Sequence, residues 1–218
     1  MSGKPKRSPA APRVWQRMLS GRRLDLADPS PFDIEIEDIA HGLARVARWN
    51  GQTTGPHAFS VAQHSVLVEA IFSGGGGGYP TREPSVSAAD SLAALLHDAP
   101  EYVIGDMISP FKALIGGEYR AIESRLLAAI HLRFGLPAER SPKLVESIKE
   151  ADRVAAYFEA VELAGFDSAE AESFFGRPSG FSLARLSVDP WPTAEAEKRF
   201  TARFQALSNA LSAESVSA

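Results

Sequence analysis

Four polar side chains fall on helical stretches that are otherwise apolar, and their types suit a metal site. His64 interrupts the apolar face of one predicted helix, His97 and Asp98 end the most apolar one, and Asp152 falls on the inner face of a third. Burying an isolated imidazole or carboxylate costs several kcal/mol unless the group is paired or metal-bound. No Lys or Arg falls on the faces of His64 or His97. Two imidazoles and two carboxylates would neutralise one divalent ion, and they suit Mn²⁺, Co²⁺, Fe²⁺ or Zn²⁺ better than Ca²⁺.

Each of these residues taken alone also has an ordinary structural explanation. A single inward histidine is more often a hydrogen-bonded core residue than a ligand, and a single inward Asp is more often a cap or an ion-pair partner. The joint pattern on three predicted helices favours one metal ion. The remaining histidines, His41, His57 and His131, are assigned no metal role.

Glu101 follows the His-Asp doublet at a spacing that suits proton transfer. It comes four residues after His97, one turn further on if the helix continues past Pro100. A carboxylate one turn from a ligand can act as base or acid for water activated by a metal. A surface acid near a helix end is the alternative explanation.

The order of these residues resembles the HD-domain metal-dependent phosphohydrolases, whose signature is an isolated His, a His-Asp doublet and a distal Asp. The resemblance covers roughly residues 20–165 and is closest to the 5′-deoxynucleotidase branch. The matching motifs are Arg48-Trp49, Ser65 after His64, His97-Asp98-Ala99-Pro100-Glu101, Gly105-Asp106, Ser109-Pro110 and Glu150-Ala151-Asp152.

The resemblance implies an all-α HD bundle in which His64, His97, Asp98 and Asp152 hold one divalent transition metal ion. It also implies that Glu101 handles protons on the hydrolytic water or the leaving group. The sequence leaves the oligomeric state open, although the resemblance to this branch, whose members form dimers, implies that a homodimer can form.

The resemblance further implies a set of substrate contacts. Arg48 would meet the substrate phosphate, because a guanidinium matches phosphate oxygens in a bidentate way. Trp49 would crowd the sugar where a 2′-hydroxyl would sit, and Asp106 would contact the sugar as part of the catalytic set. The stretch from Asn50 to Phe59 departs from the family pattern, which leaves the sugar and base preference open.

The expected function is therefore a metal-dependent phosphomonoesterase that acts on nucleoside or deoxynucleoside 5′-monophosphates. One alternative is hydrolysis of another phosphorylated small molecule such as a guanosine polyphosphate. Hydrolases of that kind resemble a pattern with Glu-Asp after the doublet, whereas Tyr102 follows Glu101 here. The other alternative is a non-catalytic module that binds a nucleotide or a metal.

Composition and charge exclude several classes of partner and site. The 218 residues are 44% hydrophobic and 23% charged, as in ordinary globular proteins. Residues 1–23 carry seven cations and no acid, which leaves 16 basic against 27 acidic side chains in residues 24–218. Such an acidic body is a poor binder of nucleic-acid polymers. We expect no membrane span. The absence of cysteine excludes disulfides and thiolate sites and fits a cytoplasmic location.

The hydrophobic pattern predicts an all-α protein of about seven helices in one domain, 24–218, after a basic N-terminal segment, 1–23. Residues 1–31 are expected to be tail and loop, no strand pattern is evident, and Gly74 to Gly78 is interpreted as a flexible connector. The predicted helices include 37–48, 60–72, 86–97, 119–135, 141–163 and 193–211.

Overall fold

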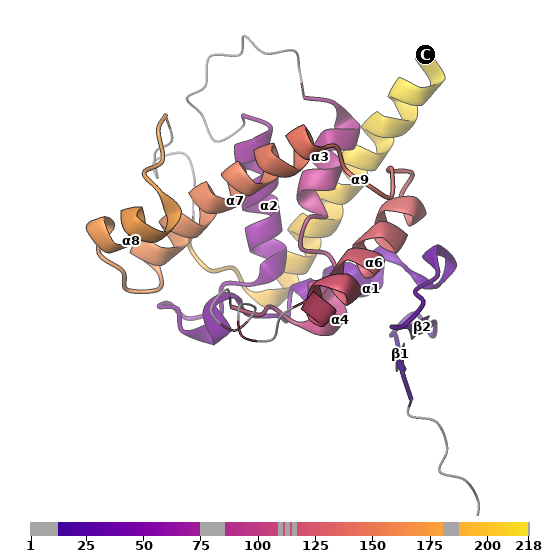
Figure 1. The fold of residues 1–218 in the computed structure, drawn as a ribbon, viewed down its shortest axis with the longest axis horizontal. Helices are drawn as coiled ribbons and strands as arrows, with labels where there is room; N and C mark the ends of the chain where they lie inside the picture. The colour runs from indigo at the N-terminus through magenta and orange to yellow at the C-terminus, as the bar shows by residue number, and fades with distance from the viewer. Residues whose placement is uncertain are drawn as a thin grey trace, which may run out of the picture.

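The computed structural model describes residues 13–74, 86–108, 111, 114, 117–180 and 188–217 of the chain. Within these residues the protein is an all-α helical bundle with one short β-hairpin, in agreement with the predicted fold class (Figure 1). The helices are α1 (Ile36–Leu43), α2 (Val61–Phe72), α3 (Ala88–Leu95), α4 (Glu101–Ile104), α6 (Gly117–Arg133), α7 (Pro142–Glu162), α8 (Ser168–Phe175) and α9 (Thr193–Ser217), with 3₁₀ turns at Pro31–Asp33 and Arg48–Gly51.

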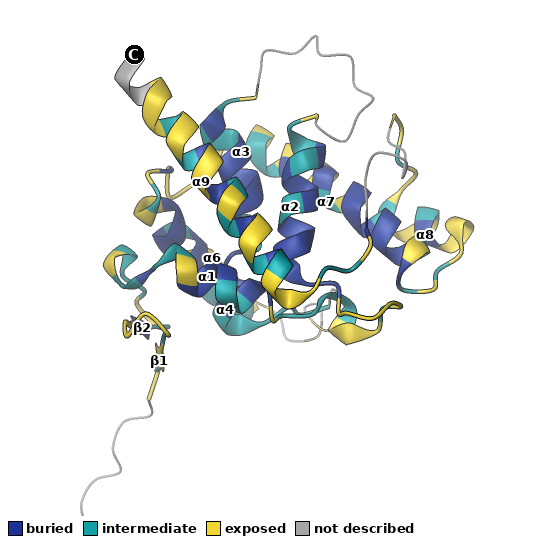
Figure 2. Cartoon of the chain, turned by 180° about the vertical axis from the view of Figure 1, so that it is seen from behind, coloured by how far each residue is buried: buried dark blue, intermediate teal, exposed yellow. Residues whose placement is uncertain are grey.

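The central helix of the bundle is α2, which is buried along most of its length (Figure 2). Its first turn joins an apolar cluster with α3 and α9 that includes Leu92 and Phe200. Further along, it joins a second cluster with α7 that includes Val68 and Phe158. Ser60 caps the helix, because its hydroxyl accepts the backbone N–H of Gln63 at 3.2 Å. The packing holds α2 from two sides and makes it a rigid support.

The long helices begin where the sequence predicts. At α7, the Ser141 hydroxyl accepts the backbone N–H of Leu144 at 3.2 Å, and Pro142 occupies the first position. The last helix, α9, continues to Ser217 instead of ending at Leu211, because no Gly or Pro stops it. The short helix α8 was not predicted.

Two predicted helices end earlier than expected. The first, predicted to reach Arg48, ends at Leu43. The chain then pairs with the segment before α2: the Arg48 N–H donates to the Phe59 carbonyl at 2.8 Å, and the Val61 N–H donates to the Val46 carbonyl at 3.0 Å. This backbone pairing replaces the last helical turn and holds Arg48 next to the start of α2.

The His-Asp doublet lies just beyond α3 and not within it. That helix ends at Leu95, and a compact turn follows in which the Ala99 N–H donates to the Leu96 carbonyl at 3.0 Å. The Glu101 N–H then donates to the Asp98 carbonyl at 3.0 Å, and α4 begins at Glu101. The expectation of one helix through His97 was therefore wrong, and Glu101 lies on a separate short helix.

The expectation of tail and loop before residue 31 was wrong for residues 15–25. These form an antiparallel hairpin of β1 (Trp15–Arg17) and β2 (Arg23–Asp25). Gly21 takes a φ of 87° in the turn, a conformation that favours glycine, and Leu24 is fully buried. Strands of three residues are too short to show a period of two in the sequence.

Several expectations concern residues outside the described ranges: the tail over 1–12, the glycine connector over 75–78, and the Ser109-Pro110 pair. Among the described helices, each is too short or too polar to cross a bilayer.

Gly42 sets the distance between α1 and α4, which carries Glu101. A Cβ at this position would lie 2.8 Å from the Cβ and 2.9 Å from the carbonyl oxygen of Tyr102. In an open helix, Gly→Ala stabilises by about 1 kcal/mol. We expect Gly42→Ala to destabilise the protein by about 1–3 kcal/mol, because α4 must move to admit the methyl group.

Urea unfolding measures this effect, and Gly117→Ala is the matched control. Gly117 begins α6, and a Cβ there would have no neighbour within 4 Å. Gly117→Ala should leave stability unchanged or slightly higher. Equal stability of the two variants would show that α1 and α4 are not in close contact.

Candidate metal centre

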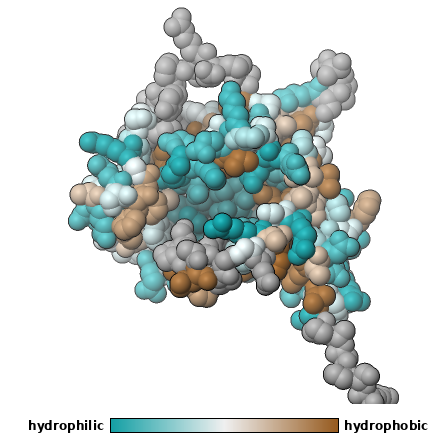
Figure 3. All heavy atoms as spheres, in the orientation of Figure 1, coloured by the Kyte–Doolittle hydropathy of each residue, from teal (hydrophilic) through white to brown (hydrophobic). Residues whose placement is uncertain are grey.

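Three segments that are distant in the sequence bring the predicted metal ligands together. His64 comes from the first turn of α2, His97 and Asp98 from the turn after α3, and Asp152 from α7. His64, His97 and Asp98 each offer one ligand atom within 4.8 Å of the others, and the two imidazole ring centres are 5.3 Å apart. Figure 3 shows hydrophilic residues gathered over the middle of the face on which α2 and α7 lie.

Hydrogen bonds fix the orientation of both imidazole rings. His97 Nδ1 lies 2.9 Å from the Ala94 carbonyl oxygen, and His64 Nδ1 lies 2.5 Å from Glu159 Oε1. A carbonyl or a carboxylate only accepts, so both Nδ1 atoms must donate a proton. An ion bound here would therefore take the Nε2 atoms as its ligand nitrogens.

The Nε2 atoms of His64 and His97 are buried and form no hydrogen bond with the residues that the structure describes. Carboxylate oxygens nevertheless approach both. Asp98 Oδ2 lies 3.2 Å from His97 Nε2 and 3.5 Å from His64 Nε2, and Asp152 Oδ1 lies 3.2 Å from His64 Nε2. This arrangement calls for a positive charge among these atoms, which a proton on His64 or a metal ion would supply, so the group of His64, His97 and Asp98 could hold a metal ion.

Asp152 is the outermost of the four predicted ligands. Its side chain is 40% exposed, compared with 0% for His64 and 7% for His97. It approaches His64 but lies outside the closely spaced group of three. Its role in binding an ion would be to complete the site from the solvent side.

The charged groups of this cluster shift one another's pKa values. Burial lowers the pKa of His64, as does the Arg48 charge, but the Glu159 and Asp152 carboxylates outweigh both and raise it to about 10. Burial raises the pKa of Asp98, yet His97, His64 and Arg48 bring it well below its usual range. Asp152 also has a lowered pKa, because its interaction with the nearby His64 outweighs its burial and the Asp98 charge. Both carboxylates are thus ionised, the form that binds cations.

The predicted phosphate contact, Arg48, lies beside this cluster. Its Nη1 is 3.9 Å from Asp98 Oδ2 and 3.7 Å from Asp106 Oδ2, which are long distances for ion pairs. Its Nε is closer to Glu159, at 3.3 Å from Oε2. The guanidinium is therefore held at its Nε end, and its outer nitrogens face the space between two carboxylates.

Trp49 and Glu101 border the same region. The Trp49 indole N–H donates to Glu159 Oε2 at 2.9 Å, and its ring contacts Phe166 and Phe175 with centres 5.7 and 6.0 Å away. Glu101 is 1% exposed and starts α4, immediately after the turn that holds the His-Asp doublet. The structure thus brings His64, His97, Asp98, Asp152, Arg48 and Asp106 close to one another and places Glu101 in the helix that follows the doublet.

Sequence reasoning missed Glu159, which is fully buried and contacts three of these residues. Burial would raise its pKa, but the Arg48 and His64 charges and the hydrogen bonds from His64 and Trp49 lower it to about 2. A signal was present in the sequence. Glu159 lies seven residues after Asp152, two helical turns along the same face of α7.

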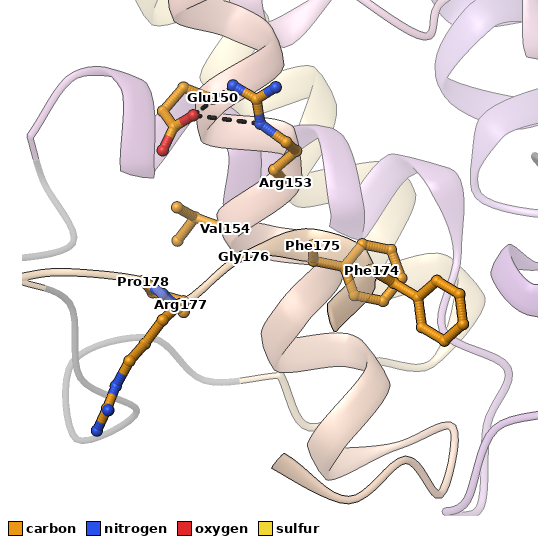
Figure 4. A pocket seen from close by; sticks show the side chains of 8 residues that line it. All are labelled: Glu150, Arg153, Val154, Phe174, Phe175, Gly176, Arg177 and Pro178. Carbon is orange, nitrogen blue, oxygen red and sulfur yellow. Dashed lines mark hydrogen bonds and ion pairs between the residues drawn. The ribbon is translucent and has the colours of Figure 1, made fainter. Parts of the chain in front are cut away.

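A cavity of about 340 Å³ opens between α7 and α8 (Figure 4). Among the described residues, no predicted site residue lines it. Its α7 side carries Glu150 and Arg153, which are ion-paired at 2.5 Å. Successive helical residues are about 100° apart, so this pair lies on a different side of α7 from Asp152 and Glu159. The candidate chemistry belongs to the cluster and not to this cavity.

Comparisons with known proteins place the chain among relatives of similar length. No protein-family model matches it. YfdR of Escherichia coli, an uncharacterized protein, is 29% identical over 193 residues, which cover 88% of this chain and 94% of YfdR. The uncharacterized protein RCAP_rcc00048 of Rhodobacter capsulatus is 55% identical over 200 residues, 92% of this chain and 98% of the relative. The chain therefore belongs to the same protein family as RCAP_rcc00048 of Rhodobacter capsulatus.

Proposed function

We propose that the protein is a metal-dependent phosphohydrolase that releases phosphate from nucleoside or deoxynucleoside 5′-monophosphates. The position of Arg48 carries this proposal. Its Nη1 lies 3.9 Å from Asp98 Oδ2, an oxygen of the group that could hold an ion. A guanidinium and a cation site that share one carboxylate can together bind the oxygens of a single phosphate.

Different residues around Arg48 would bind the ion and the phosphate. His64, His97, Asp98 and Asp152 would hold the ion. The ion would polarise a phosphoryl oxygen and increase the nucleophilicity of water at neutral pH. Arg48 would bind and orient the phosphate dianion. Its Nε is held by Glu159, and its Nη1 makes only long ion pairs with Asp98 and Asp106, which a phosphate would replace.

Other side chains would serve the leaving group and the sugar. Glu101 is buried beside the doublet, where it could move a proton to the leaving oxygen or from water. Trp49 shares its hydrogen-bond acceptor, Glu159 Oε2, with Arg48, and Asp106 Oδ2 lies 3.7 Å from Arg48 Nη1. In the proposed enzyme these two side chains would contact the sugar, as the resemblance to the 5′-deoxynucleotidase branch of the HD-domain enzymes implies.

Two other functions would use the same cluster. A guanosine polyphosphate hydrolase would need the ion and Arg48, but Tyr102 stands where the resemblance for that class has an Asp. A non-catalytic binding module would need the ligands but not a buried Glu101. We therefore favour the nucleotidase and place it in the cytoplasm, in keeping with a chain that has no cysteine.

The metal prediction is tested on purified protein. We expect about one transition-metal ion per chain by elemental analysis, and a lower melting temperature after chelation, because the ion binds the folded state. His97→Ala should lose most of the ion. Asp152→Asn should lose less, because this carboxylate is the most exposed of the four ligands.

His41→Ala is the matched control for these variants. His41 lies in the last turn of α1, and its imidazole is 3.6 Å from Glu197 on α9. The metal content of this variant should therefore equal that of the wild type. Full occupancy and unchanged melting in both ligand variants would exclude this metal site.

The substrate class is tested with a panel of phosphorylated compounds in the presence of Mn²⁺, Co²⁺, Fe²⁺ or Zn²⁺. We expect released phosphate from 5′-monophosphates, and more from deoxynucleotides if Trp49 crowds the sugar. Turnover of guanosine polyphosphates alone would favour the first alternative function. Metal-loaded protein with no turnover of any compound would favour the binding module.

The roles of Glu101 and Arg48 are separated by kinetics. If Glu101 moves protons without binding the ion, Glu101→Gln should keep the metal and lose roughly 10²–10⁴-fold in kcat. Arg48→Ala should raise KM and lower kcat/KM, because it removes phosphate binding in the ground and transition states.

Glu162→Gln serves as the control for the Glu101 variant, because it removes an exposed acid near the end of α7. It should leave the kinetics within a few-fold of the wild type. Glu101→Gln with full metal and full turnover would remove the proposed mechanism and leave proton transfer to another residue.

A further inference from the structure

One buried carboxylate connects the candidate ion site to the candidate phosphate site. Glu159 Oε1 accepts a hydrogen bond from His64 Nδ1 at 2.5 Å. Its Oε2 accepts hydrogen bonds from the indole N–H of Trp49 at 2.9 Å and from the Nε–H of Arg48 at 3.3 Å. In the proposed function His64 binds the ion, whereas Arg48 and Trp49 contact the substrate.

We propose that Glu159 is a positioning residue that sets both the ion affinity of His64 and the placement of Arg48 and Trp49. The proposal rests on the proposed function, and it adds a coupling between the two halves of the site. Glu159 itself would touch neither the ion nor the substrate. It would act by orienting the groups that do.

The donor count gives this carboxylate a role that no neutral side chain can take. All three groups around Glu159 are donors, and a carboxylate accepts at both oxygens. A glutamine amide accepts at one end only. If its oxygen faces Trp49 and Arg48, its NH₂ faces His64 Nδ1, which must then accept, and the ring proton moves to Nε2. The lone pair needed by the ion is lost.

The opposite amide orientation damages the other half of the site. If the glutamine oxygen faces His64, its NH₂ faces the N–H groups of Trp49 and Arg48. Donors then meet donors in a place that solvent does not reach, and one or both side chains must move. Glu159→Gln is therefore expected to damage one half in either orientation.

Trp49 depends on this support more than an ordinary surface tryptophan would. Its backbone has a φ of 57°, which is an unfavourable conformation for a residue with a large side chain. The hydrogen bond to Glu159 and the contacts with Phe166 and Phe175 hold the ring in place. Loss of the hydrogen bond should release the strained turn around Trp49.

The test compares Glu159→Gln with the wild type in two measurements that do not need catalysis. The first is Zn²⁺ or Mn²⁺ affinity, measured with the metal alone against a competing chelator. We expect about a 10- to 100-fold loss, as for other residues that orient a ligating histidine. The second is the indole N–H resonance of Trp49, assigned by its absence in Trp49→Phe. We expect it to shift or broaden.

Glu69→Gln is the matched control, because it makes the same change at a second buried glutamate. Glu69 is 1% exposed, lies on α2 five residues after His64, and pairs with Arg203 on α9 at 2.6 Å. Glu69→Gln should lower the melting temperature but keep the wild-type ion affinity and the Trp49 resonance. Glu159→Asp, which keeps the charge, should retain more ion affinity than Glu159→Gln.

The outcomes separate the two proposals. A folded Glu159→Gln variant with wild-type ion affinity and an unchanged Trp49 resonance overturns the role of Glu159. An equal loss of ion affinity in Glu69→Gln overturns it too, because the effect would then be general destabilisation. A wild-type protein that binds the ion but hydrolyses no monophosphate removes the proposed function, whereas the ratio of ion affinities still decides the role of Glu159.

Discussion

Glu159 is buried without solvent contact, and its two oxygens hold the imidazole of His64, the indole of Trp49 and the guanidinium of Arg48. A carboxylate in this position is tolerated only while its neighbours supply hydrogen bonds and positive charge. The segments that carry these neighbours, α2 and the 3₁₀ turn at Arg48–Gly51, are therefore held to α7 at one point. A shift of any of the three would leave a buried charge without a partner.

The same constraint explains why so many charged groups can gather in one part of a small bundle. Asp98, Asp106 and Asp152 place three carboxylates close to Arg48 and the two imidazoles. The imidazoles and Arg48 lower the electrostatic cost of the carboxylates, which is why the pKa of Asp98 is low although it is largely buried. In a protein whose residues 24–218 carry 27 acidic and 16 basic side chains, these local cations would decide whether a phosphate can approach.

The site combines rigid helices with irregular backbone. His64 and Glu159 lie within α2 and α7, which pack on one another and cannot rotate freely. Asp98 and Arg48 lie where helices end, and there the backbone takes conformations that a helix excludes, such as the positive φ of Trp49. Functional side chains commonly lie on loops, because the packed helices fix the position of the loop and the irregular backbone sets the direction of each side chain.

The sequence by itself determined the all-α class, the starts of α7 and α9, and the group of His64, His97 and Asp98 that could hold an ion. These follow from local rules: helical periodicity, capping residues, and the cost of placing His64 or Asp152 on an apolar face. The missed features lack such a local signal. Three-residue strands show no period, and the loss of the last turn of the predicted 37–48 helix depends on pairing with Phe59. Only the tertiary structure decided that Glu159 faces His64, Arg48 and Trp49, because its partners come from segments about 95 to 111 residues away in the chain. An inward acid can be recognised from helical spacing, but the donors that make it stable are known only when the helices are packed.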